Sequence, residues 1–123
     1  MTFIVRVQVE ISAAHSLRGY HGNCARTHGH NWKVLAEIKA NELDSLGMAV
    51  DFKELKSAMM EIANIIDHQN INEIHPFDEI NPTAENIAKW FYNELALTVN
   101  DSRLNLSSIT IWETDRSSVR YSE

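Results

Sequence analysis

Apolar and polar residues alternate through the first eleven positions of the chain. The odd positions are apolar and the even positions are mostly polar, a period of two that is typical of a strand with one buried face. The apolar positions are Phe3, Val5, Val7, Val9 and Ile11. The same parity continues through Ala13 to His15, so His15 is expected on the apolar side, at or just past the end of this strand.

The same alternation predicts a second strand over residues 30–40. Its apolar side carries Trp32, Val34, Ala36, Ile38 and Ala40, and its other side is mostly polar. His28 and His30 share the parity of the apolar side. The loop 16–27 joins the two strands, and Gly19 and Gly22 give it turn freedom.

From residue 51 the period changes to that of a helix. Asp51 is a plausible N-cap of a first helix, whose apolar stripe is Phe52, Leu55, Met59, Ile62 and Ile66. Residues 67–81 read as irregular, and Pro76 opposes regular structure there. A second helix is predicted after Pro82, with Thr83 as its cap, the stripe Ile87, Phe91 and Leu95, and its end at residues 100–102.

Period two returns in the last part of the chain. Ile109, Ile111 and Glu113 share one face of a strand, and a closing strand is expected around Val119 and Tyr121. The predicted order is ββααββ, an α+β fold in which two helices pack on one face of an antiparallel sheet. We expect the strand edges at residues 3–11 and 106–113 to lack partners within the chain.

Composition agrees with one ordinary globular domain over residues 1–123. Hydrophobic residues make up 44% and charged residues 23% of the chain. The net charge of −6 argues against broad binding to nucleic acid, which needs a basic face. No apolar run is long enough to span a membrane, and residues 1–6 lack a signal-peptide pattern, so a cytoplasmic location is predicted.

The candidate chemistry centres on the segment from Cys24 to His30. His28 and His30 lie two positions apart on a strand and therefore point to one side, which is also the side of His15. Three protein ligands with an open fourth position are typical of catalytic zinc, so we predict that these histidines bind Zn²⁺. Glu113 is a second anomaly, because a carboxylate among isoleucines is costly to bury without a partner.

Each of these residues also has a plain structural interpretation. The chain's single cysteine, Cys24, could be a small buried apolar residue, and the His-Gly-His segment could hold two structural histidines. Asp67 and His68 could form a helix terminus, where a cationic histidine suits the helix dipole. Glu113 could pair with Arg116 or Arg120 in a salt bridge.

Six segments taken in order resemble the T-fold enzymes of pterin metabolism, which include 6-pyruvoyltetrahydropterin synthase and bacterial 6-carboxytetrahydropterin synthase. The resemblance covers essentially the whole chain. It rests on residues 13–15, 24–30, 50–56, 67–72, 81–86 and 113–114. The three residues between Cys24 and His28 are similar to the spacing in the carboxy enzyme of the queuosine and deazapurine pathway. Ile66 and Ile71 depart from the leucines that the family often has there, a change that mainly affects packing.

This resemblance implies a set of roles. His15, His28 and His30 would bind zinc; Cys24 would be the general base; Asp67 and His68 would relay protons; Glu113 would anchor the pterin ring. Arg26, Thr83 and Glu85 are further substrate-binding candidates, although Thr83 and Glu85 look first like a helix cap.

The implied activity is a zinc-dependent lyase-type conversion of 7,8-dihydroneopterin triphosphate to 6-carboxytetrahydropterin, with release of acetaldehyde and triphosphate. Formation of the pyruvoyl product is the runner-up within the enzyme class. A non-catalytic zinc-stabilised binding module is the alternative outside that class. The resemblance also implies that trimers close the sheets into a β-barrel and that two trimers stack as a homohexamer.

Overall fold

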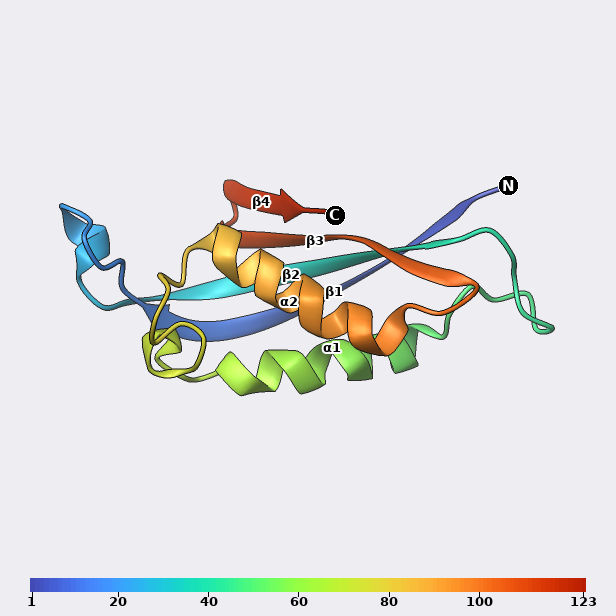
Figure 1. Ribbon diagram of the computed structural model, residues 1–123, viewed down its shortest axis with the longest axis horizontal. Coiled ribbons are helices and arrows are strands. Elements are labelled where there is room, and N and C mark those ends of the chain that lie inside the picture. Colours follow the sequence, from blue (N-terminus) through green and yellow to red (C-terminus); the bar gives the residue numbers. More distant parts are fainter.

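Four antiparallel strands form one sheet in the order β1-β2-β3-β4, and two helices cover one of its faces (Figure 1). The computed structural model describes residues 1–123. Its elements are β1 (Phe3–His15), η1 (Asn23–Ala25), β2 (His28–Ala40), α1 (Phe52–Ile66), η2 (Ile71–Glu73), α2 (Ala84–Val99), β3 (Leu104–Thr114) and β4 (Ser117–Tyr121). The order and the α+β class are as the periodicity predicts.

β1 and β2 pair along their whole length, from Phe3 opposite Ala40 to His15 opposite His28. Both strands are longer than predicted, because His15 lies inside β1 and β2 begins at His28 rather than His30. The indole Nε1 of Trp32 donates to the carbonyl of Ala13 at 3.1 Å and fastens this end of the pair. All three histidines therefore sit on regular, paired backbone.

Both helices begin at the predicted caps. The Asp51 side chain accepts from the backbone N–H of Lys53 at 2.8 Å, and the Thr83 hydroxyl accepts from that of Asn86 at 3.1 Å. The predicted apolar stripes are buried against the sheet with one exception: Phe52 is 66% exposed. Phe52 lies at the first position of α1, where the chain enters the helix beyond the edge of the core.

β4 covers only the second half of β3. It pairs from Tyr121, opposite Ile109, to Ser117, opposite Thr114. The prediction that residues 106–113 form an open edge is therefore wrong for residues 109–113, because a tight turn at 115–116 folds the chain back along them. The prediction for residues 3–11 agrees with the structure, since β1 has only β2 as a strand neighbour.

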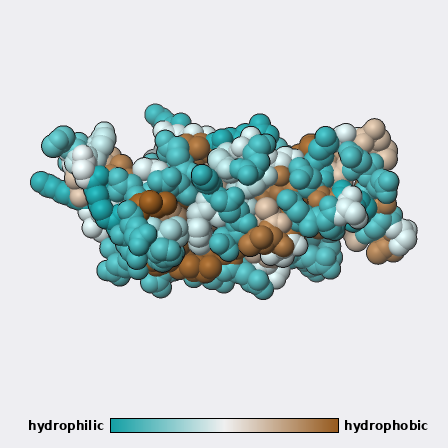
Figure 2. Space-filling model, in the orientation of Figure 1, coloured by the Kyte–Doolittle hydropathy of each residue, from teal (hydrophilic) through white to brown (hydrophobic).

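The core lies between the sheet and the helices, and its largest fully buried side chains include Trp32, Phe77 and Phe91. Figure 2, drawn from the same side as Figure 1, shows a mostly hydrophilic surface on which hydrophobic residues form small separate patches. Neither α1 nor α2 is long and apolar enough to cross a membrane.

Candidate functional site

Four side chains that could hold a metal ion meet at one end of the sheet. His15 comes from β1, His28 and His30 from the start of β2, and Glu113 from the end of β3, and one ligand atom from each lies within 4.8 Å of the others. His15 is buried and the other three are partly exposed. The strand parities that predict three converging histidines are confirmed. Glu113 joins them because β3 pairs with β2 in a register that brings its carboxyl end to the same place.

Backbone carbonyls fix the orientation of two of the imidazoles. His15 Nδ1 lies 2.8 Å from the carbonyl oxygen of Pro82, and His28 Nδ1 lies 2.7 Å from that of Arg26. A carbonyl can only accept, so each Nδ1 carries the proton and, in the neutral ring, each Nε2 keeps a free lone pair. Metal-binding histidines are commonly held in this way by an outer partner. His15 and His28 could therefore each bind a metal ion through Nε2, while Nδ1 holds the ring in place.

The remaining contacts inside the cluster also favour a cation. Glu113 Oε1 lies 2.9 Å from His30 Nε2 and 3.4 Å from His15 Nε2. Nevertheless both Nε2 atoms are buried without a hydrogen bond of acceptable geometry. Buried polar atoms without partners are costly. A metal ion bound by three imidazoles and a carboxylate would give both Nε2 atoms a partner. This set of ligands suits zinc and related divalent metals.

The protonation of His30 is consistent with a ligand role. Burial, the largest influence, lowers the pKa of His30; Glu113 opposes it, and the neighbouring His15 and His28 lower the pKa further, so the net shift is downward. A lowered pKa keeps the imidazole neutral near pH 7, the form that can bind a metal. The alternative that Glu113 pairs with Arg116 or Arg120 is wrong, because Arg120 contacts Glu37 and Ser108, and no ion pair of Arg116 is present.

Cys24 and Arg26 lie on the loop 16–27, which extends beyond this end of the sheet, opposite to the N-terminus (Figure 1). Cys24 sits in the short helical turn η1 and is partly exposed. Its carbonyl accepts from the backbone N–H of Leu17 at 2.9 Å, which ties the turn to the start of the loop. Cys24 lies outside the four-residue cluster, and it is not a fully buried apolar residue.

Asp67 and His68 follow the last turn of α1 and pack along the outer edge of β1. Asp67 is the C-cap of α1, as the plain interpretation predicts, but it also accepts from Ser12 N at 2.9 Å and lies 3.0 Å from His68 Nδ1. Burial by itself raises the pKa of Asp67, but the Ser12 and His68 contacts outweigh burial and the net shift is downward. An ionised Asp67 can thus orient the His68 ring, which is 79% exposed on a left-handed backbone (φ 57°).

Two polar cavities adjoin the cluster. The first, of about 460 Å³, is lined by His30 and His68 together with residues 12–14 of β1. The second, of about 540 Å³, is lined by His30 and Glu113 and has no hydrophobic residue in its wall. His68 and His30 therefore line one shared cavity within a single chain.

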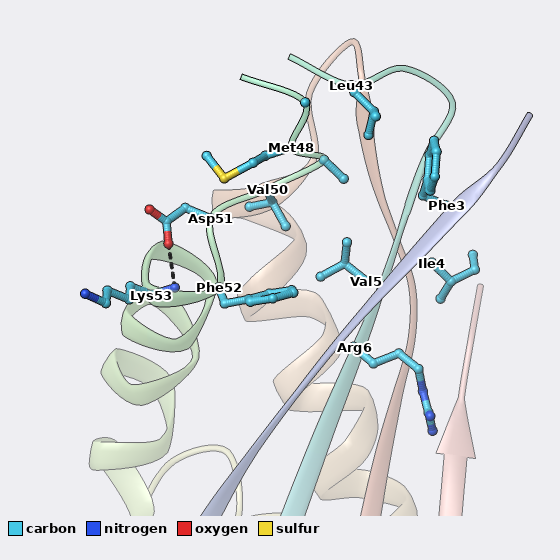
Figure 3. A pocket seen from close by; sticks show the side chains of 12 residues that line it. Phe3, Ile4, Val5, Arg6, Leu43, Met48, Val50, Asp51, Phe52 and Lys53 are labelled. Carbon is cyan, nitrogen blue, oxygen red and sulfur yellow. Dashed lines mark hydrogen bonds between the residues drawn. The ribbon is translucent and has the colours of Figure 1, made fainter. Parts of the chain in front are cut away.

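The largest cavity, of about 610 Å³, lies at the opposite end of the sheet (Figure 3). Phe3 and Val5 from β1 and Val50 and Phe52 from the entry to α1 surround it. Its only acidic side chain, Asp51, is occupied as the cap of α1. This cavity has no histidine or cysteine in its wall, and it carries none of the predicted chemistry.

Two further candidates lie at the start of α2. Thr83 is its cap, and Glu85 is an acidic residue in its first turn, a placement that the helix dipole favours. The interpretation as a helix cap is therefore confirmed for Thr83, whereas Glu85 makes no capping hydrogen bond. The preceding residue, Pro82, supplies the carbonyl that holds His15, a role that the sequence did not suggest, because the two positions are 67 residues apart.

Comparison with known proteins gives a consistent result. Residues 4–123 match the profile of the family described as 6-pyruvoyl tetrahydropterin synthase. The 6-carboxy-5,6,7,8-tetrahydropterin synthase of Haemophilus influenzae is 32% identical over 98% of this chain and 99% of that protein. The enzyme of the same name from Synechocystis is 29% identical over 97% and 92%. The structure of 6-pyruvoyl tetrahydropterin synthase from Caenorhabditis elegans superposes with a TM-score of 0.88 at 25% identity, over 100% and 96% of the two chains.

Proposed function

Because this chain belongs to the 6-pyruvoyl tetrahydropterin synthase family, we propose that it is a zinc-dependent 6-carboxytetrahydropterin synthase. The substrate would be 7,8-dihydroneopterin triphosphate, and the products 6-carboxytetrahydropterin, acetaldehyde and triphosphate, as a step toward queuosine and related deazapurines. The observation that carries the proposal is the convergence of three imidazoles, two of them held by carbonyls as Nε2 ligands, beside an exposed acid–base pair.

His15, His28 and His30 would hold the zinc ion. When bound, the ion would polarise the hydroxyls of the substrate side chain and so acidify the neighbouring C–H protons. Three protein ligands leave room for those hydroxyls. The lowered pKa of His30 supports this role, because the neutral ring is available near pH 7.

Four other side chains would handle protons and substrate. Cys24 Sγ would take up a proton from the substrate side chain, since its loop rises from the same end of the sheet. His68, oriented by the ionised Asp67, would pass protons on. Glu113 would accept the N–H groups of the pterin's aminopyrimidine edge, which two carboxylate oxygens match, and its side chain is 32% exposed beside a polar cavity. Arg26, Thr83 and Glu85 remain proposed secondary contacts.

We expect the zinc-loaded protein to produce 6-carboxytetrahydropterin and acetaldehyde in equal amounts. Together with triphosphate, these two products contain the atoms of the substrate and one water molecule. The pyruvoyl product and triphosphate contain the atoms of the substrate alone, so that reaction consumes no water and releases no aldehyde. Mass spectrometry of the pterin and hydrazine trapping of the aldehyde distinguish the two. A pyruvoyl product without acetaldehyde would establish the runner-up, and absence of any turnover would favour the non-catalytic module.

The non-catalytic alternative has one specific observation in its favour. Glu113 could act as a fourth protein ligand, and a closed set of four is typical of structural zinc. The Asp67–His68 pair argues against a non-catalytic module, because a purely structural zinc site does not require an exposed imidazole that a carboxylate orients.

We further propose that the chain forms homotrimers that close into a β-barrel, with two trimers stacked as a hexamer. The outer edge of β1 at residues 3–11 has no strand neighbour, and exposed backbone edges favour pairing with another chain. Phe3 (37% exposed), Ile4 (46%) and Phe52 (66%) place apolar surface at the same end. Both features would be covered in a closed barrel.

In such an assembly Asp67 and His68 would reach the zinc and Cys24 of a neighbouring subunit. Two inactive variants, Cys24→Ala and His68→Ala, should then regain partial activity when refolded together, because some interfaces combine two intact halves. The shared cavity of His30 and His68 within one chain supports the competing arrangement. No recovery in verified mixed oligomers, or full activity of a monomer in light scattering, would establish that each chain builds its own site.

A further inference from the structure

The outer edge of β1 from Ser12 onward, together with the first residues of the following loop, is paired without a fifth strand. Alternate backbone N–H groups, those of Ser12 and Ala14 in β1 and of Ser16 and Arg18 just after it, point outward. Each of them has an acceptor in the segment 67–81. The four hydrogen bonds are Ser12 N to Asp67 Oδ1 (2.9 Å), Ala14 N to Gln69 O (3.0 Å), Ser16 N to Asn72 Oδ1 (2.8 Å) and Arg18 N to Asn81 Oδ1 (2.8 Å). We call this series the outer ladder.

Two asparagines complete the outer ladder by acting like peptide groups. Asn72 Nδ2 donates to the carbonyl of Ser16 at 2.9 Å, and Asn81 Nδ2 donates to that of Arg18 at 2.9 Å. Each side-chain amide thus accepts from and donates to one backbone residue, as a strand partner would. Only an amide has both a donor and an acceptor in this geometry.

The Arg18 side chain binds the same segment from the other direction. Its Nη2 donates to the carbonyls of Phe77 (2.8 Å) and Asn72 (3.2 Å), and its Nη1 to that of Ile80 (3.3 Å). The Arg18 guanidinium has no carboxylate partner, so its contribution is to hold three backbone carbonyls by hydrogen bonds and not to neutralise a negative charge. A planar guanidinium can reach three acceptors at once, which a lysine ammonium on a single nitrogen does less well.

The outer ladder joins the parts of the chain that carry the proposed chemistry. It begins at Asp67 and His68, passes His15, and ends at Arg18, where the loop to Cys24 starts. Leu17 N, between the last two rungs, holds the carbonyl of Cys24. We propose that Arg18, Asn72 and Asn81 are positioning residues that fix the Cys24 loop relative to the zinc site of the same chain. This inference rests on the roles proposed above for Cys24 and the three histidines.

The test compares Arg18→Ala and Arg18→Lys with Arg103→Ala in the zinc-loaded full chain. Arg103 is a matched control, because its Nη1 also donates to a backbone carbonyl, that of Glu42 at 3.0 Å, at the other end of the sheet. We expect Arg18→Ala to lower kcat by about 10- to 100-fold, the range that a displaced catalytic group produces, with KM and zinc content close to wild type. Arg18→Lys should recover part of the loss, and Arg103→Ala should match wild type.

Hydrogen exchange gives a readout that does not depend on turnover. Backbone amides of residues 16–26 should exchange faster in Arg18→Ala than in wild type, while those of β2 and β3 stay unchanged. If Arg18→Ala fails to fold, Asn81→Asp takes its place with the same expectations. This variant keeps a side-chain oxygen that accepts from Arg18 N, but it loses the Nδ2 group that donates to the Arg18 carbonyl. Wild-type kcat together with unchanged exchange would overturn the inference. An inactive wild-type enzyme would refute the proposed function, and the exchange data would still decide whether the outer ladder holds the loop.

Discussion

His28→Ala should abolish most zinc binding while the fold is kept. In the proposed site the ring would contribute one of three imidazole ligands, and its other nitrogen is held by the carbonyl of Arg26. Loss of an outer partner alone weakens metal binding by about 10- to 100-fold, and loss of a direct ligand should exceed that. Metal analysis after gel filtration measures the zinc content, and circular dichroism checks the fold.

Two variants make the zinc experiment specific. His75→Ala removes a loop histidine that pairs with Asp78 outside the cluster, so its zinc content should equal that of wild type. Glu113→Ala separates the two classes of function: a catalytic three-histidine site should keep its zinc, whereas a structural four-ligand site should lose it. Full zinc content in folded His28→Ala would exclude the proposed metal site.

Cys24→Ala should lose catalysis without losing metal. General bases contribute about 10²- to 10⁴-fold to rate, so kcat should fall within that range, whereas zinc content and the unfolding temperature should stay close to wild type. The structural reason is local. The turn η1 is held through the carbonyl of Cys24, which alanine keeps, and the thiol lies outside the metal cluster. Single-turnover kinetics with 7,8-dihydroneopterin triphosphate measures the chemical step.

Cys24→Ser is the matched variant for this test, because it keeps the size of the side chain but replaces the thiol with a hydroxyl that ionises far less readily. It should be nearly as slow as Cys24→Ala. Activity of either variant close to that of wild type would assign Cys24 a structural role and leave His68 as the remaining candidate base.

The elements of this fold could be predicted because their signals are local. Strand parity in β1 and β2 depends on neighbouring residues, and it was sufficient to bring His15, His28 and His30 to one side. The caps Asp51 and Thr83 act within three residues, so both helix starts could be read directly. A hydrophobic pattern with period two or period 3.6 indicates the type of element and its buried face, but it does not indicate which distant residues will contact that element.

The outer partners of the site could not be predicted in the same way. The carbonyl of Pro82 that orients His15 carries no side-chain signal, and it lies 67 residues away. The amides of Asn72 and Asn81 look like ordinary loop polarity until the fold places them beside β1. Such contacts depend on tertiary arrangement rather than local pattern.

At His68, which has a left-handed backbone, selection for stability and selection for the proposed reaction should favour different residues. A non-glycine residue at φ 57° costs on the order of 1–3 kcal/mol, which glycine avoids and asparagine reduces. A random library of this chain sorted for resistance to heat alone should therefore accumulate glycine or asparagine at position 68. The same library sorted for growth that depends on the reaction should keep histidine. Position 68 would then be where sequences from the two selections diverge, and an imidazole retained there would record selection for chemistry at the expense of stability.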